Sequence, residues 1–227
     1  MTDIPDANPL THSAEDYLKA IYALSGDAPA STTRIAQRLA LAPASVSGMI
    51  RRLSEQDLIA HEPYRGVVLT PAGRRLALRV LRRHRVIETY LVQFLGYRID
   101  DVHDEADRLE HAVSDLLVER MAAALGHPRV DPHGDPIPDR DGALDEVAYT
   151  ALPDLPIGVE AALCRVDISD SDRLRYVARA GLVPGARVQL VDLQPFEGPV
   201  TVRVGGRRKV LGRDMARLLL CVPADGA

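Results

Sequence analysis

The chain has 227 residues, of which 46% are hydrophobic, enough for one large domain or for two or three small ones with real cores. No apolar run approaches the ~18 residues of a membrane-spanning helix, and the first residues are acidic and polar, unlike a secretory signal. The two cysteines, Cys164 and Cys221, do not indicate a disulfide framework, so we expect a cytoplasmic protein with no membrane partner.

The net charge of -4 conceals a strong asymmetry along the chain. Residues 34–85 contain eleven arginines against three acidic residues, so this segment carries +8 and the rest of the chain carries -12. A basic block inside an acidic protein indicates a polyanion-binding surface. The alternative is a set of solvated helix faces in a protein that uses arginine in place of lysine.

The first part of the chain has the pattern of a winged helix-turn-helix. Apolar residues at helical spacing predict three helices, over residues 13–24, 32–39 and 44–56. Two short strands at 58–61 and 67–70 then enclose a turn and form the wing. In such domains the last helix enters the major groove, while the wing follows the phosphate backbone. The residues expected to contact DNA are Arg34, Ser45, Ser47, Arg51, Arg52 and Arg65.

Two longer helices are predicted next. The first begins at Thr70-Pro71, ends near Leu95 and is strongly basic in its first half. The second runs from Asp104 to Leu125 and is more apolar than a single small partner requires, which favours a homodimer core.

These two helices carry side chains that can bind a metal ion. His84 and Glu88 lie one turn apart on the first helix. At about 100° per residue, four further side chains fall within roughly one quarter of the next helix: His103, Asp107, Glu110 and His111. A stripe of carboxylates and imidazoles facing a second such pair predicts a divalent cation site, because these groups would otherwise repel one another.

The last third of the chain changes character. Residues 127–156 contain six of the sixteen prolines and are predicted to form a linker. Alternating runs then predict strands at 161–166, 188–193 and 200–204, with one helix at 171–180. Four or five short strands in all suggest a small barrel, which we expect to contact the rest of its own chain.

The order and spacing of several motifs resemble the diphtheria-toxin-repressor family of metal-dependent transcriptional regulators, and in particular its manganese-responsive branch. The resemblance covers nearly the whole chain. Its motifs are Ala14-Glu-Asp-Tyr-Leu18, Ser45-Val-Ser47, Arg83-His84-Arg85 with Glu88, the segment His103 to His111, and Asp131-Pro-His-Gly-Asp-Pro-Ile-Pro138.

The resemblance implies a mainly α protein with small β parts. Its N-terminal winged helix-turn-helix domain would cover residues 1–73, and a helical dimerisation and metal-binding domain would cover 74–140. A linker at 141–156 would lead to an SH3-like, FeoA-like barrel at 157–227.

The family's ligand positions fall on chemically suitable residues. The primary metal site would use Asp16, Asp107, Glu110 and His111. A second site would use His84, Glu88 and His103. Some members add two ligands from the barrel, of which the first matches Asp170, but the second falls on Arg173, which cannot bind a metal ion.

Departures from the iron-type members favour Mn(II) over Fe(II), the second choice of cofactor. Asp16 and Asp107 stand where iron-type members have a methionine and a cysteine, so soft sulfur ligands are replaced by oxygen. Lys19 stands where some manganese-type members have a second acidic ligand, so a two-manganese cluster of that subtype is not reproduced intact.

The implied function is that of a repressor that is not an enzyme and that uses manganese to control manganese-uptake genes. Its partners would be a palindromic double-stranded operator and a second copy of the chain, with one or two dimers on each operator. The alternatives are an iron-dependent repressor of the same family and a metal-independent winged-helix regulator. A metal-dependent enzyme is disfavoured because the chain has no His-Glu-x-x-His, nucleophile elbow or phosphate loop.

Single residues also have simpler explanations. Asp16 could stabilise the dipole at the start of its helix, and His84 with Glu88 could be a surface pair worth a few tenths of a kcal/mol. Asp170 lies in a stretch, Ser169-Asp-Ser-Asp172, that is typical of a helix start.

Overall fold

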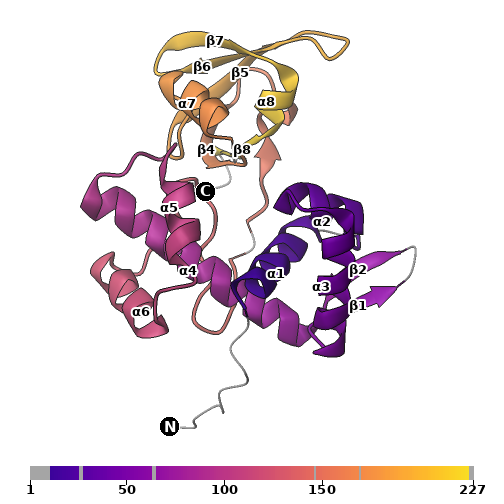
Figure 1. The fold of residues 1–227 in the computed structure, drawn as a ribbon. Helices are drawn as coiled ribbons and strands as arrows, with labels where there is room; N and C mark the ends of the chain where they lie inside the picture. Colours follow the sequence, from indigo (N-terminus) through magenta and orange to yellow (C-terminus); the bar gives the residue numbers. More distant parts are fainter. Residues whose placement is uncertain (1–10, 26–27, 63–64, 146, 169, 225–227) are drawn as a thin grey trace. The chain divides into compact units, whose positions relative to one another are not determined.

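The computed structural model describes residues 11–25, 28–62, 65–145, 147–168 and 170–224. The chain divides into two compact units (Figure 1). The first comprises residues up to Arg83 together with residues 138–143. The second comprises residues 84–137 and everything from Leu144 onward.

The first unit contains the predicted winged helix-turn-helix. Its helices are α1 (His12–Leu24), α2 (Thr32–Leu39) and α3 (Pro43–Glu55), and its wing is the antiparallel pair β1 (Ile59–Glu62) and β2 (Gly66–Leu69). Thr11 caps α1 by accepting a hydrogen bond from the Ala14 amide at 3.3 Å, and Ser31 caps α2 in the same way. The apolar stripes of the three helices meet in one core that includes Leu18, Ile35 and Leu53.

Helix α4 (Pro71–Leu95) begins in the first unit and continues into the second. Its first turn lies so close to the backbone just before β1 that only glycine fits there. A Cβ atom on Gly73 would stand 1.9 Å from the carbonyl oxygen of Leu58. The predicted helix from Pro71 to Leu95 is confirmed at both ends.

The single helix predicted from Asp104 to Leu125 is wrong. The chain forms α5 (Val102–Leu109) and α6 (Asp115–Ala124), which are separated by a turn. Ser114 causes the break, because its hydroxyl accepts a hydrogen bond from the Leu117 amide at 3.3 Å and so caps α6. Glu110 therefore caps the C-terminal end of α5, and His111 lies in the turn rather than on a continuing helical stripe.

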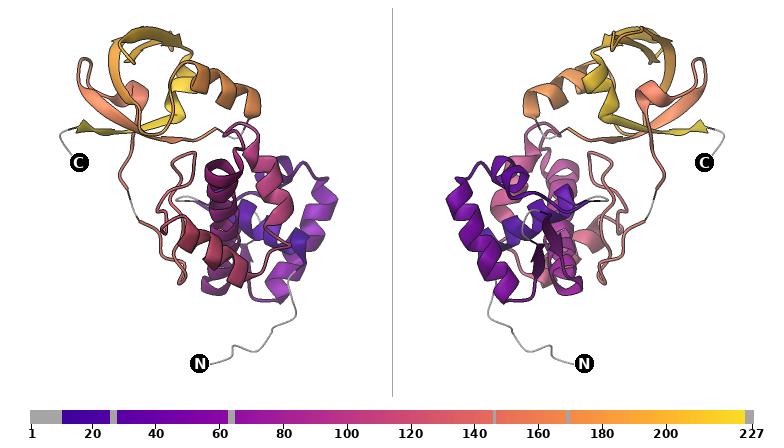
Figure 2. Two further views of the ribbon diagram at one scale, coloured as in Figure 1. Left: turned by 90° about the vertical axis from the view of Figure 1, so that its left-hand side faces the viewer. Right: turned by 90° about the vertical axis from the view of Figure 1, so that its right-hand side faces the viewer.

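The C-terminal part of the second unit is a curled, wholly antiparallel six-stranded sheet in the order β3-β8-β4-β5-β6-β7 (Figure 2). Its strands are β3 (Thr150–Ala151), β4 (Glu160–Val166), β5 (Arg187–Leu193), β6 (Val200–Val204), β7 (Arg207–Leu211) and β8 (Leu219–Pro223). A 3-10 turn (Leu152–Asp154) and helices α7 (Ser171–Arg179) and α8 (Arg213–Arg217) contribute to the same core, in which Leu163, Leu190 and Leu219 are fully buried.

This sheet is the predicted small barrel, with more strands among the described residues than the four or five expected. The two residues of β3 lie inside the segment predicted to be a linker and pair with β8. None of the helices in the described segments is both long enough and apolar enough to cross a bilayer.

Candidate metal centre

Three donor atoms converge where α4 faces α5. His84 and Glu88 are one turn apart on α4, and His103 lies in the first turn of α5. The Nε2 atom of His84 lies 2.9 Å from Oε1 of Glu88 and 3.0 Å from Nδ1 of His103, and the last two atoms are 3.1 Å apart. Adjacent ligands at ~2.1 Å from one ion in octahedral geometry are separated by ~3.0 Å. These donors therefore already have the spacing of three metal ligands.

The other nitrogen of His84 faces a second group of oxygen donors. Its Nδ1 atom lies 2.7 Å from Oε2 of Glu110 and 3.2 Å from Oδ1 of Asp107. The second Glu110 oxygen, Oε1, lies 3.4 Å from Nε2 of His111. The Glu110 side chain is fully buried, so a charged carboxylate there requires a compensating positive charge. Three of the residues predicted for the primary site, Asp107, Glu110 and His111, thus lie at the end of α5 and in the turn that follows it, rather than along one continuous helix.

A third group was not assigned any role from the sequence. Oε2 of Glu88 lies 3.5 Å from Nδ1 of His133, and Asp131 offers a ligand oxygen to the same buried cluster. Both residues belong to the proline-containing segment that supported the family resemblance. An aspartate and a histidine two positions apart in such a loop were the available signal. Because the loop approaches α4 from a distant part of the sequence, helical spacing could not reveal the contact.

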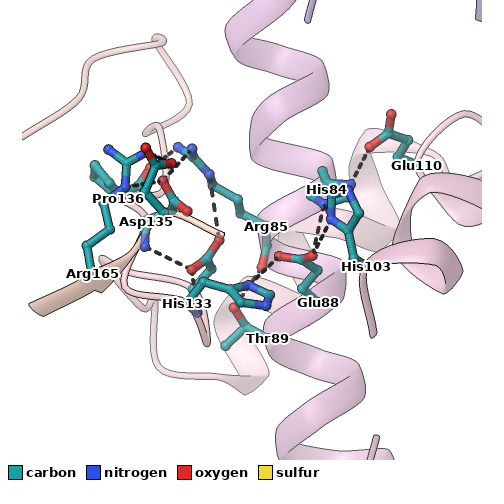
Figure 3. A network of polar contacts seen from close by, with 12 residues as sticks. His84, Arg85, Glu88, Thr89, His103, Glu110, His133, Asp135, Pro136 and Arg165 are labelled. Carbon is teal, nitrogen blue, oxygen red and sulfur yellow. Dashed lines mark hydrogen bonds and ion pairs between the residues drawn. The ribbon is translucent and has the colours of Figure 1, made fainter. Parts of the chain in front are cut away.

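The loop is held by a dense polar network (Figure 3). Oδ1 of Asp131 accepts hydrogen bonds from the amides of His133 at 2.8 Å and Asp135 at 2.9 Å. The Asp135 carboxylate in turn contacts Arg85 at 3.1 Å and Arg165 of β4 at 2.9 Å. The loop is thus fixed to α4 on one side and to the barrel on the other, within the same unit.

The charges in this cluster depend strongly on one another. Burial raises the pKa of Glu88, but hydrogen bonds from His103, His133 and His84 outweigh it and hold that pKa well below its usual range. Burial lowers the pKa of His84, but its bonds to Asp107, Glu110 and Glu88 outweigh burial and raise the pKa well above 6.5.

The two loop residues are also shifted. Burial, reinforced by the nearby charges of Asp135 and Glu88, raises the pKa of Asp131 to about 7. Burial lowers the pKa of His133, but the hydrogen bond and charge of Glu88, with a further contribution from Asp131, bring it to about 9. In the absence of a cation, protons on His84 and His133 offset the buried carboxylate charge.

The donor set suits a hard or borderline divalent cation. The groups consist of carboxylate oxygens and imidazole nitrogens, whereas Cys164 and Cys221 lie on barrel strands outside every group found among the described residues. Glu88 could serve two positions, because its two oxygens face different histidines. A bound cation would replace the protons as the charge that balances these carboxylates.

Two predicted ligands lie on other elements of the chain. Asp170 is the N-cap of α7, where Oδ1 accepts a hydrogen bond from the Arg173 amide at 2.8 Å, and it belongs to none of the groups in the described part of the chain. Asp16 lies on α1 in the first unit, half-buried and beyond the first helical turn. The simple explanation of Asp16 as a first-turn acid therefore does not apply; Glu15 occupies that turn.

The residues predicted to contact DNA are all exposed in the first unit. Four of them lie on α3, and the other two lie on α2 and immediately before β2. Ser47 donates a hydrogen bond to the carbonyl of Pro43 at 3.1 Å, and Arg51 forms an ion pair with Glu55 at 2.9 Å. The structure leaves the complete predicted set at the surface: Arg34, Ser45, Ser47, Arg51, Arg52 and Arg65.

Comparison with known proteins agrees with this architecture along the whole chain. Residues 9–67 match the iron dependent repressor N-terminal DNA binding domain. Residues 70–139 match the metal binding and dimerisation domain of the same repressors, and residues 150–223 match the FeoA domain. The exposed apolar residues Phe94, Leu95 and Leu116 lie within the dimerisation segment.

Individual relatives extend over nearly the full length of this chain. The iron-dependent repressor IdeR of Mycobacterium tuberculosis is 32% identical over 92% of this chain and 96% of its own length. A solved manganese-dependent transcriptional repressor in complex with manganese is 40% identical, with a TM-score of 0.86 over 92% of this chain and 99% of that one. The manganese regulator SloR is 33% identical, with a TM-score of 0.78 over 94% and 100% of the two chains.

These relatives are described as repressors or regulators, and the matched domain families are described by DNA binding, metal binding and dimerisation. This supports a regulator rather than an enzyme. The chain belongs to the iron-dependent repressor, or diphtheria toxin repressor, family of metal-dependent transcriptional repressors.

Proposed function

We propose that the protein is a manganese-responsive repressor that uses Mn(II) as co-repressor at genes for manganese uptake. The observation that carries this proposal is the donor chemistry of the metal groups, which consist of carboxylates and imidazoles without a sulfur ligand. Oxygen-rich sites suit manganese, while thiolates and thioethers favour later transition metals. The 40% identity with a manganese-dependent repressor points in the same direction.

In this proposal the primary site joins the two units of the chain. Asp16 of the DNA-binding unit and three residues of the second unit, Asp107, Glu110 and His111, would hold one cation. The ion supplies positive charge that offsets the repulsion among three carboxylates. Holding Asp16 restricts the orientation of the DNA-binding unit, so two recognition helices of a dimer can enter successive major grooves of a palindromic operator, as one dimer or two.

The second site would be formed by His84, Glu88 and His103, with Asp131 and His133 completing it on the other side of Glu88. The donors of this second site all come from the second unit. A cation bound there would therefore mainly order that unit and the loop from Asp131 to Ile137. We do not include Asp170, because its carboxylate caps α7.

The DNA contacts follow from the exposed faces of the first unit. Ser45 and Ser47 lie near the N-terminal end of α3, where base edges are read, and the neighbouring Gly48 offers no side chain for base recognition. Arg34, Arg51, Arg52 and Arg65 would contact phosphates, and each should lower the salt slope by about one when replaced by alanine. Specificity would then depend more on DNA shape than on direct base contacts.

Metal and DNA binding are thermodynamically linked in this mechanism. Any factor by which the cation strengthens operator binding must equally strengthen cation binding when the operator is present. A coupling of ~1–3 kcal/mol corresponds to a ~5- to 150-fold change in operator affinity.

Operator binding by metal-free protein, titrated with Mn(II) and then anaerobically with Fe(II), tests the proposal. We expect activation at a lower free concentration of Mn(II), and loss of that activation in Asp16→Ala and Glu110→Ala. Asp104→Ala, an exposed acid on α5 outside the metal groups, is the matched control and should respond normally. Activation by Fe(II) at a lower free concentration than Mn(II) would identify iron as the co-repressor. Metal-independent operator binding by the variants would refute the bridging mechanism.

A further inference from the structure

A second basic surface lies on the barrel, apart from the arginines of the DNA-binding unit. A groove of about 450 Å³ runs between the C-terminal end of α7 and the β6–β7 hairpin. Four cationic side chains from three different elements line it: Arg179 of α7, Arg187 of β5, and Arg207 and Lys209 of β7. No acidic residue is among the described residues that line the groove.

The surroundings do not neutralise this charge. Residues 179–211 contain six basic residues against two acidic ones, Asp192 and Glu197. Glu197 is paired with Arg217 at 2.8 Å. Within the described chain, the groove cations make one ion pair, between Arg187 and Glu160 at a long 3.9 Å. The groove is therefore a concentrated positive surface.

The hairpin beside the groove adds to the positive charge. Arg203 of β6 and Arg208 of β7 are directly opposite one another in the antiparallel register. Like charges in that position destabilise a strand pair. A polyanion that lies along the hairpin would relieve this repulsion.

Two structural explanations account for part of the pattern. Basic residues on β7 protect an edge strand from pairing with other chains, and Arg179 favours the negative end of the α7 dipole. Neither explains why Arg187, on an interior strand, joins the same groove. Convergence of charge from three elements on one concavity is typical of an anion-binding surface.

The lining also limits the ligand. Between the cations lie small groups such as Gly181, Val204 and Gly205, and no aromatic residue is among the described lining residues. A groove without aromatic rings has no platform on which a nucleobase could stack, whereas arginines match the oxygens of a phosphate. The fitting ligand is a row of phosphates that is recognised without its bases.

We propose that this barrel groove binds the phosphate backbone of double-stranded DNA that flanks the operator. The inference rests on the proposed function, which supplies the DNA. In this proposal the barrel contacts DNA directly, without regard to base sequence, while the winged helices recognise the operator.

The test compares full-length, Mn(II)-loaded protein on two operator duplexes. One is trimmed to the operator, and the other is extended by ~10 bp, about one helical turn, on each side. The groove variant is Arg179→Gln/Arg207→Gln. The control is Arg129→Gln/Arg173→Gln, which removes the same charge from exposed positions outside the groove.

The groove variant should bind the trimmed duplex like wild type but lose the extra affinity for the extended one. Its salt slope on the extended duplex should fall by about two for each protomer that contacts the flank. Equal binding of both duplexes by wild type, or equal losses in the groove and control variants, would overturn the inference while metal-dependent operator binding stands. If wild type binds neither duplex with any metal, the proposed function and this inference both fail.

Discussion

Replacing Asp131 by asparagine should stabilise the metal-free protein while weakening its metal binding. Oδ1 of Asp131 accepts two backbone hydrogen bonds, from His133 and Asp135, and an asparagine oxygen can accept both. The substitution therefore keeps the loop turn but removes a buried negative charge. A residue that served only to hold the loop would show neither effect.

The size of the stabilisation follows from the pKa of Asp131, which rises from 3.8 to about 7. A carboxyl group whose pKa is raised on folding disfavours the folded state once it ionises. The penalty is absent below pH 4, grows as the pH rises to 7, and is complete above that. At 1.36 kcal/mol for each pH unit, it reaches about 4 kcal/mol. The variant should escape this penalty at pH 8, which corresponds to a rise in Tm on the order of 10 °C.

Thermal unfolding at pH 5 and pH 8, with chelator or with Mn(II), measures both effects. In chelator the variant should gain stability mainly at pH 8, and its Mn(II) affinity should fall by about 10- to 100-fold. Asp139→Asn is a matched control, because Asp139 accepts the same two kinds of backbone bond, from Asp141 and Ala143, at an exposed position. A destabilised Asp131→Asn in chelator, or one that binds Mn(II) as wild type does, would refute the reasoning.

Three further outcomes are expected. Gly134→Ala should lower the free energy of unfolding by about 2–4 kcal/mol in chemical denaturation, because a Cβ there would lie 1.8 Å from a carbonyl oxygen of β4. Gly158→Ala, at a position with the same positive φ but open space around it, should lower it by less. Mn(II) affinity should rise at least about tenfold for each pH unit from 6.5 to 9, because the cation displaces the proton of His133 together with that of His84. Calorimetry in buffers of different ionisation enthalpy should show less proton release in His133→Gln. Hydrogen bonds from Arg98 and Arg175 lower the pKa of Asp100 to about 2. The ionised Asp100 therefore stabilises the fold above pH 3.8, and this stabilisation is lost as the pH falls through 2. Asp100→Asn should therefore lower stability by about 1–3 kcal/mol at neutral pH and flatten the acid unfolding curve; unchanged curves would contradict this.

The N-terminal unit was predictable because each element has a local signature. Leu18, Ile35 and Leu53 lie on apolar stripes of three short helices, and the structure buries all three. The break between α5 and α6 was not predicted, because a serine can lie inside a helix or cap one, and the sequence around Ser114 does not distinguish the two roles. Only the conformation of the preceding turn distinguishes the two roles.

The barrel and the loop show a different limit of sequence reasoning. Strand β7 begins with three consecutive basic residues and lacks the alternation expected of a half-buried strand; it lies at the sheet edge, where charged side chains protect against pairing with other chains. The contacts of Glu88 with His133 join residues 45 positions apart. Spacing along a helix predicts candidate ligands on one element, as with His84 and Glu88, but it cannot bring in a candidate from a distant loop.

The barrel is joined to the loop of residues 131–137 by its backbone as well as by charge. The carbonyl of His133 accepts a hydrogen bond from the amide of Val166 at 2.9 Å, and Arg165 pairs with Asp135. Strand β4 thus holds in place a loop that has no regular secondary structure of its own. A chain truncated before the barrel would keep its winged helix and most of the proposed metal ligands, yet it would hold Asp131 and His133 in a loosened loop. The first measurable defect of such a chain would be a higher metal concentration needed for operator binding, rather than a failure to recognise the operator.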